Sequence, residues 1–204
     1  MVAEGEHERQ DFKFAVSDAR KIARSVSAFA NRDGGRLLIG VKDNGTIAGV
    51  RNEEDAYVVE TAASIYCRPA VPVSFHAYSV DTGIRVIVAE IAPCATRPVT
   101  ASEPDGTWRA WYRVADENIA AHPLMVRAWQ RAADGIALVL TDSHASLLRL
   151  LDARVELPAD SRSLAVALHI SGHAAAEAAV ELAAAGVLTF VHTRAGFMLR
   201  RPEN

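Results

Sequence analysis

The 204-residue sequence contains two cysteines, Cys67 and Cys94, and no uninterrupted apolar stretch that approaches a bilayer span. Two cysteines are too few for a disulfide framework or a cysteine-ligated metal cluster, so both are expected to be reduced thiols of a cytoplasmic protein. The N-terminal segment is acidic and lacks the apolar core of a secretory signal. No Walker-type phosphate loop is present, which removes the basis for ATP binding. We therefore expect no membrane partner and no nucleotide cofactor.

The sequence also has no excess of positive charge, because it contains 22 Lys and Arg and 25 Asp and Glu, which give a net charge of −3. A global electrostatic attraction to nucleic acid is therefore excluded. Any such contact must come from a local concentration of cations. The 50% hydrophobic and 23% charged residues are typical of a folded globular protein.

Hydrophobic periodicity predicts an α+β fold in two domains, at residues 1–133 and 140–204. For the first domain, a mixed sheet is expected. Ser17 is the expected N-cap of its first helix, and Asn44-Gly45 reads as a hairpin turn followed by a returning strand. The predicted helices cover 16–32, 53–66 and 123–133, and the predicted strands cover 36–41, 46–50, 71–77, 84–91 and 108–114. Residues 81–83 are expected to form a turn and 93–106 a long polar loop.

The pattern of hydrophobic residues changes in the second domain. Helices are predicted over 143–153, 163–169 and 173–185, and a β-hairpin over 187–191 and 197–200. Two helices, a tight turn, a third helix and a hairpin form the winged-helix pattern.

Three motifs occur in order in the first domain: Asp11-Phe12-Lys13, the run from Ala28 to Gly35, and the run from Leu38 to Val50. A later strand motif is matched by Tyr112-Arg113-Val114. Together these motifs resemble the Schlafen AlbA-type domain over about residues 6–131. That family is commonly labelled DNA-binding, and older labels call it a divergent ATPase-associated domain. In bacteria it resembles the N-terminal half of regulators that end in a winged helix.

The resemblance and the local charge together favour nucleic-acid binding without catalysis, to either DNA or RNA. Cations gather near the first helix, and the Asn31 to Gly35 turn offers backbone N–H groups to a phosphate. A solvated helix face and a simple glycine C-cap are the alternatives that remain open. The candidate binding residues are Arg20, Lys21, Arg24, Asn31, Arg32, Gly34, Gly35, Arg36, Lys42 and Arg113.

A divalent-metal RNA endonuclease of Schlafen type is the second hypothesis. The resemblance implies three acidic ligands, which fall here on Glu6, Asp11 and Asp43, with Lys13 beside a phosphate. Carboxylates suit Mg²⁺ or Mn²⁺, either of which activates water for phosphate cleavage. Two departures weaken this hypothesis: the family more often has Glu at position 11, and Lys42 stands where it often has an acidic residue.

The helix at 173–185 is nearly all alanine, and its Glu177 and Glu181 would repel phosphate. A small face of this kind permits close helix approach. We therefore expect the second domain to bind a protein partner or to form a homodimer in preference to reading DNA. The favoured function is a bacterial, cytoplasmic transcription regulator that binds nucleic acid and needs no cofactor, and a protein-interaction scaffold is the remaining alternative.

Overall fold

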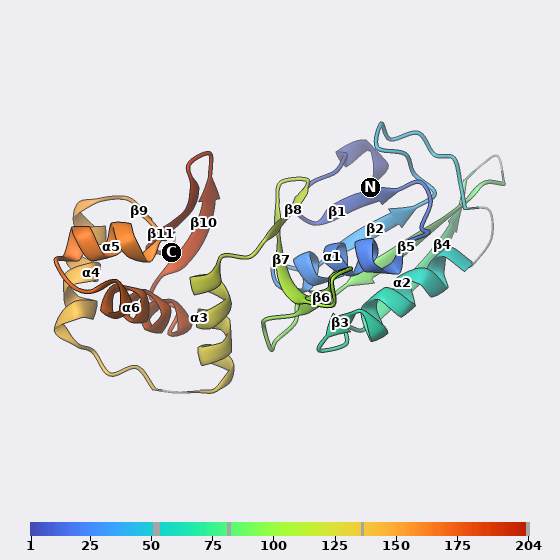
Figure 1. Ribbon diagram of the computed structural model, residues 1–204. Coiled ribbons are helices and arrows are strands. Elements are labelled where there is room, and N and C mark those ends of the chain that lie inside the picture. Colours follow the sequence, from blue (N-terminus) through green and yellow to red (C-terminus); the bar gives the residue numbers. More distant parts are fainter. Residues whose placement is uncertain (51–53, 81–82, 136, 203–204) are drawn as a thin grey trace. The chain divides into compact units, whose positions relative to one another are not determined.

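The computed structural model describes residues 1–50, 54–80, 83–135 and 137–202. The chain divides into two compact units, Met1–Ala121 and His122–Asn204, each with its own core (Figure 1). Helices and mixed or antiparallel sheets occur in the described residues, so the predicted α+β class is confirmed. None of the described helices is both long enough and apolar enough to cross a membrane.

The first unit is built on a four-stranded sheet. Strand β1 (Gln10–Lys13) runs parallel to β2 (Gly35–Ile39), and the other neighbours in this sheet pair antiparallel. The spatial order is β1, β2, β5 (Arg85–Ile91) and β4 (Val73–Ser79). Leu37, Leu38 and Ile39 of β2 are all buried, because both faces of this strand are covered.

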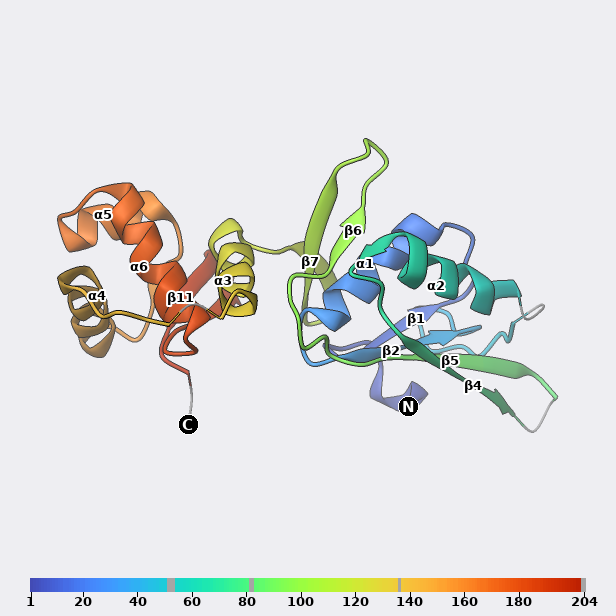
Figure 2. The ribbon, with the colours of Figure 1, turned by 90° about the horizontal axis from the view of Figure 1, so that it is seen from below.

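Helices α1 (Ala19–Ala30) and α2 (Glu54–Ile65) lie over one face of this sheet (Figure 2). Ile22, Val26 and Phe29 of α1 fall at helical spacing and are fully or almost fully buried against the sheet. The N-cap of α1 is Asp18 and not Ser17, because the Asp18 carboxylate accepts from the N–H groups of two residues in the first turn. The opposite face of the sheet is covered by a smaller apolar cluster, beside the short helix η1 (Val2–Glu4).

A second four-stranded sheet packs against α1. It runs in the order β3 (Cys67–Arg68), β6 (Thr100–Ser102), β7 (Trp108–Val114) and β8 (Glu117–Ala120). The predicted strand 108–114 is confirmed, whereas the predicted loop 93–106 is wrong because β6 lies within it. Strand β6 is only three residues long and is held by its neighbours on both sides, so local periodicity does not reveal it.

The predicted returning strand at 46–50 is also wrong. One isolated bridge joins Val41 to Ile47, and β2 takes β1 and β5 as its neighbours. The turn itself is present, because Gly45 N–H donates to Lys42 O at 2.8 Å. The predicted turn at 81–83 and the start of the predicted helix at 53 fall on positions 51–53 and 81–82, which lie outside the described residues.

In the second unit, the described residues form four helices and a three-stranded sheet. Its helices are α3 (Pro123–Ala133), α4 (Asp142–Ala153), α5 (Ser161–Leu168) and α6 (Gly172–Ala184). Strands β9 (Leu157–Pro158), β10 (Thr189–Thr193) and β11 (Gly196–Arg200) are ordered β10-β11-β9. All three helices and the hairpin predicted after residue 140 are confirmed. The sequence pattern groups the helix at 123–133 with the first domain, but the structure packs α3 against α6 in the second unit.

Candidate nucleic-acid interface

Asp11 of β1 is the buried acidic group around which the candidate site is built, with 3% of its surface exposed. Lys13 lies two residues further along the strand, and therefore on the same side of the sheet. Its Nζ lies 2.7 Å from Asp11 Oδ2, while Ser25 Oγ of α1 donates to the same oxygen at 3.2 Å. Arg113 Nη2 of β7 lies 3.5 Å from Asp11 Oδ1. Both carboxylate oxygens therefore have partners within the fold.

Glu6 lies beside Asp11, as the sequence hypothesis requires. Its Oε1 accepts the Phe12 N–H at 2.8 Å. Burial raises the pKa of Glu6, and the hydrogen bond with the Asp11 carboxyl raises it further. Burial also acts to raise the pKa of Asp11, but the hydrogen bond from Glu6 and the charges of Lys13 and Arg113 outweigh it, so the Asp11 pKa is lowered. Glu6 is therefore the member of the pair that takes up a proton first.

Asp43, the third acidic residue of the nuclease hypothesis, lies exposed in the turn after β2. Within the described ranges, no group of three His, Cys, Asp or Glu side chains is arranged to hold a metal ion. The structure thus brings together Glu6, Asp11 and Lys13, but it does not add Asp43 to them.

Arg113 is 1% exposed, so it does not reach the surface where nucleic-acid binding would require it. Its guanidinium donates to Gln10 O at 3.2 Å, to Asn118 Oδ1 at 3.1 Å and to His7 O at 3.4 Å. The same group lies 5.2 Å from the centre of the Phe29 ring. These contacts give Arg113 a structural role, since a buried guanidinium must have its donors satisfied.

Asn31, at the C-cap of α1, is also fully buried. Its Oδ1 accepts from Val99 N at 2.7 Å, and its Nδ2 donates to Val99 O at 2.7 Å and to Trp111 O at 2.9 Å. The amide therefore joins the end of α1 to the second sheet, so its side-chain groups have a structural role.

Gly34 and Gly35 make the predicted helix-to-strand turn. Gly34 has φ +72° and donates its N–H to Phe29 O at 3.0 Å, closing the helix. A Cβ on Gly35 would lie 2.3 Å from the Phe29 ring. Close packing thus explains both glycines, in agreement with the C-cap alternative.

Three of the predicted cations are matched by carboxylates. Arg24 pairs with Glu103 and lies over the Trp111 ring. Arg32 lies 2.8 Å from Glu8 and donates to the Arg113 carbonyl. The third, Arg36, makes hydrogen bonds of 2.6 Å to the Glu4 carboxylate and to the Gln10 side chain. The cations therefore do not form one continuous free patch.

Arg20, Lys21 and Lys42 have no ion pair with any carboxylate among the residues described. The Arg20 guanidinium lies over Tyr66 and the Lys42 ammonium over Phe14, at 5.1 Å and 5.2 Å from the ring centres. These exposed side chains remain available to a polyanion.

One open cavity gathers part of this positive charge on the surface of the first unit. We call it the Lys21 cavity; its volume is about 410 Å³. Ser25 and Asn118 connect it to the buried Asp11, because Asn118 Nδ2 donates to Ser25 Oγ at 2.9 Å. The lining residues are Lys13, Lys21, Arg24, Ser25, Trp111, Glu117 and Asn118.

Sequence reasoning missed Ser25, Glu103 and Asn118. Strand β8, which carries Asn118, follows a turn in which Ala115 adopts φ +50°, and no glycine or asparagine stands at that position to signal the turn. Ser25 lies within the helical pattern, where nothing local distinguishes it from a neutral helix residue.

The Schlafen, AlbA_2 family model matches residues 6–122. The chain belongs to this family. No curated protein matches the sequence. The DIP2311 protein from Corynebacterium diphtheriae is similar at 21% identity and a TM-score of 0.48, over 94% of this chain and 34% of that chain. The N-terminal domain of a protein related to the ATP-dependent DNA helicase RecG, from Nitrosomonas europaea, is similar at 22% identity and a TM-score of 0.40. That match covers 60% of this chain and 92% of that chain. The chain spans about a third of the length of the DIP2311 protein, and its AlbA_2 domain contains the whole Lys21 cavity.

Proposed function

We propose that the AlbA_2 domain binds the sugar-phosphate backbone of a nucleic acid at the Lys21 cavity. The observation that carries the proposal is the convergence of three cations, Lys13, Lys21 and Arg24, on one open cavity that is also lined by the Asn118 amide. Phosphate oxygens accept from ammonium, guanidinium, hydroxyl and amide donors. The resemblance to a family labelled DNA-binding supports the same conclusion.

Lys21 is the residue on which binding depends most. Lys13 and Arg24 each already contact one carboxylate, whereas Lys21 has none within the described part of the chain. Its charge is therefore not compensated when the cavity is empty. A phosphate that enters replaces a counterion at this position, and release of that ion favours binding.

Recognition of the backbone fits this cavity better than recognition of bases. Trp111 is the aromatic group in the lining, but Arg24 covers one ring face and Glu103 accepts from its Nε1 at 3.0 Å. A base stacking on that face would have to displace the guanidinium. We therefore expect weak sequence preference and strong salt dependence.

A salt-titrated binding measurement tests the proposal. Fluorescence anisotropy with duplex DNA, single-stranded DNA and RNA should give affinities that fall steeply as salt rises. Lys21→Glu should weaken binding by about tenfold or more, because it reverses the uncompensated charge. Arg36→Ala is the matched control, since Glu4 and Gln10 already hold that guanidinium. A flat salt dependence, or equal losses in the two variants, would overturn the proposal.

The nuclease alternative is favoured by one observation, the adjacency of Glu6 and Asp11. The donor set does not fit a three-carboxylate metal site, because Lys13, Ser25 and Arg113 already contact the Asp11 oxygens. The third acid, Asp43, is not brought to the pair. We expect no cleavage of RNA or DNA with Mn²⁺ or Mg²⁺. Metal-dependent cleavage that both Asp11→Ala and Asp43→Ala abolish would establish the nuclease instead.

For the second unit we infer a winged helix that does not read DNA through α6. The order α4, β9, α5, α6, β10, β11 supports this topology. Helix α3 packs along α6, where Arg127 pairs with Glu177 and Arg131 Nη2 lies 2.6 Å from Glu181. The alanine side chains permit this close approach within one chain. Six residues of α6 are buried within the unit, which supports a packing role for this helix in preference to entry into a major groove.

Substitution of the hairpin arginines tests this second inference. Changing Arg194, Arg200 and Arg201 together to alanine should leave nucleic-acid affinity unchanged. A sharp loss would show that the second unit contacts the nucleic acid. A solution mass measurement on the same samples tests the expected homodimer, which remains a proposal.

A further inference from the structure

The second unit contains an open cavity between α5 and the segment that enters β9, with a volume of about 480 Å³. It is distinct from the α3–α6 contact and takes no part in the proposed nucleic-acid binding. Apolar and basic side chains line it together. The lining residues are Arg154, Leu157, Pro158, Arg162, Ser163, Leu164, Val166 and Ala167.

We infer that this cavity, hereafter the α5 cleft, docks a short acidic peptide segment that inserts apolar side chains. Leu157 and Leu164 are 2% and 1% exposed and form a fixed apolar floor. Val166 lines the cleft and is 70% exposed, while Val155, next to Arg154, is 83% exposed. Exposed valines beside a preformed apolar cavity are typical of a protein-interaction site.

The charge around the cleft determines the chemistry of the partner. Arg154 and Arg162 are both exposed, and neither has an ion pair with the described residues. Arg201 differs, because its Nη2 lies 3.0 Å from Asp152. Two uncompensated guanidiniums beside an apolar floor complement carboxylates flanking an apolar side chain.

Asp160, at the start of α5, forms no ion pair with either arginine within the described part of the chain. Asp160 is the N-cap of α5, and its Oδ1 accepts the Ser163 N–H at 2.8 Å. The hydrogen bonds from Ser163 lower the pKa of Asp160. The carboxylate therefore stays ionised at the helix end, but it forms no ion pair with Arg154 or Arg162, so both guanidiniums remain open to an acidic partner.

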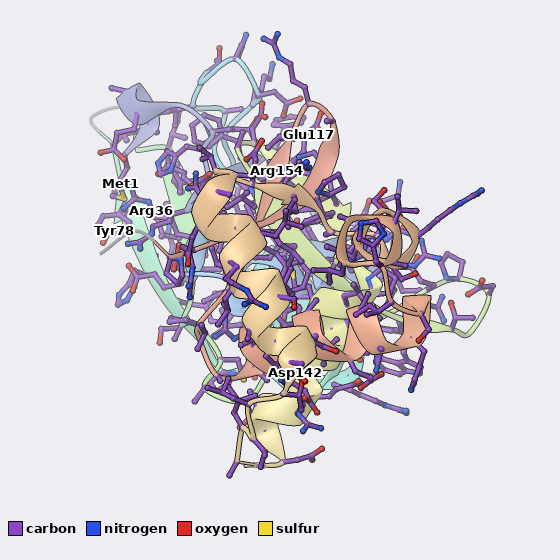
Figure 3. The ribbon with its side chains drawn as sticks, turned by 90° about the vertical axis from the view of Figure 1, so that its left-hand side faces the viewer. Met1, Arg36, Tyr78, Glu117, Asp142 and Arg154 are labelled. Atoms are coloured by element: carbon purple, nitrogen blue, oxygen red, sulfur yellow. The ribbon has the colours of Figure 1, made fainter. Side chains whose placement is uncertain are left out.

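The backbone indicates how the peptide binds. Ala159 N–H donates to Phe197 O at 2.9 Å, so alternation places the backbone nitrogen of Pro158 at the free edge of β9. Proline has no N–H to donate there, which disfavours addition of a further strand. Because strand addition is disfavoured, we expect an amphipathic helical segment that inserts side chains into the cleft. Arg154, which lines the cleft, lies at the end of α4 opposite Asp142 (Figure 3).

Nucleic acid is the competing occupant, since phosphates also pair with arginine. Phosphates would satisfy Arg154 and Arg162, but they would leave Val166 and the leucine floor uncovered. The apolar lining therefore favours a peptide.

Fluorescence anisotropy on the full chain tests the inference. The probe is a short labelled helical peptide with two leucines one turn apart, flanked by glutamates. Its two analogues replace the leucines with serine or the glutamates with glutamine. The full chain should bind the parent peptide, and both analogues should bind at least about tenfold more weakly.

Variants localise the binding. Val166→Asp should abolish it without unfolding the unit, because the side chain is exposed, and Val139→Asp is the matched control at a 75% exposed valine outside the cleft. The Arg162→Glu variant should bind a peptide whose glutamates are replaced by lysine more tightly than it binds the parent peptide. Absence of binding by the parent peptide, equal binding by Val166→Asp, or displacement of the peptide by single-stranded DNA at comparable concentration would each overturn the inference.

Discussion

Asp11 of β1 and Arg113 of β7 form an ion pair inside the first unit, with 3.5 Å between Oδ1 and Nη2. The two residues belong to different sheets, and both are almost fully buried. Their contact links the strand that carries Asp11-Phe12-Lys13 to the strand that carries Tyr112-Arg113-Val114. One buried ion pair thus joins residues from two of the sequence motifs.

Arg113→Met is expected to destabilise the AlbA_2 domain by about 3–5 kcal/mol, because it leaves Asp11 buried without its arginine partner. Gln10 and His7 would also lose donors to their carbonyl groups. Urea unfolding measures the change. Arg109→Met, at an exposed position of the same strand, is the control and should change the stability by less than about 0.5 kcal/mol. Equal stability of the two variants would contradict a structural role for Arg113.

The sequence predicted strand β7 because apolar and polar residues alternate over Trp108–Val114. It did not predict β1, which is short, begins with two polar residues and depends on parallel pairing with β2. Pairing between distant segments is not encoded in local periodicity. The contact between Asp11 and Arg113 was missed for the same reason, although both residues were singled out.

Asn31→Ala should cost about 2–4 kcal/mol, since it leaves the Val99 N–H and the Trp111 carbonyl buried without their Asn31 partner, while Ser27 Oγ still donates to the Val99 carbonyl. Thermal and urea unfolding measure the effect. Asn44→Ala is a suitable comparison, because the Asn44 side chain accepts from Thr46 N in an exposed turn. A loss at Asn31 no larger than the loss at Asn44 would show that the buried amide is not structural.

Gly35→Ala is predicted to destabilise the domain through a clash, because the added Cβ would meet the Phe29 ring at 2.3 Å. The cost should be about 1–3 kcal/mol, the range for overpacking a core. Gly172→Ala is the matched substitution in α6, where the nearest atom outside the helix is 3.7 Å away. That variant should be neutral or stabilising. Similar losses at both sites would remove close packing as the reason for Gly35.

The candidate site shows where sequence reasoning reaches its limit. The cluster of cations was visible in the sequence, but their carboxylate partners Glu4, Glu8 and Glu103 come from other segments. Only the fold determines that Glu4 and Gln10 bind the Arg36 guanidinium, whereas Lys21 has no carboxylate partner among the described residues. Charge counts along a sequence predict where cations concentrate, whereas their availability depends on three-dimensional pairing.

The stability of the second unit should depend on pH through His122, the N-cap of α3. Its Nδ1 accepts the Leu124 N–H at 3.3 Å, and its ring stacks on Phe190 at 6.1 Å between centres. Burial lowers the pKa of His122, although the Asp160 charge partly opposes this effect. Protonation would remove the acceptor and place a positive charge at a helix N-terminus.

The lowered pKa fixes the sign of the effect. The unfolded chain takes up a proton on His122 near pH 6.5 while the folded form stays neutral, so stability falls as pH drops below about 6.5. The loss ends once the pH is below the folded pKa. His122→Asn keeps a capping acceptor that does not titrate. Urea unfolding of both proteins between about pH 5 and pH 8 should therefore show a smaller acid-induced loss in the variant. Parallel pH profiles would contradict a role for the imidazole, because all other titrating groups are shared.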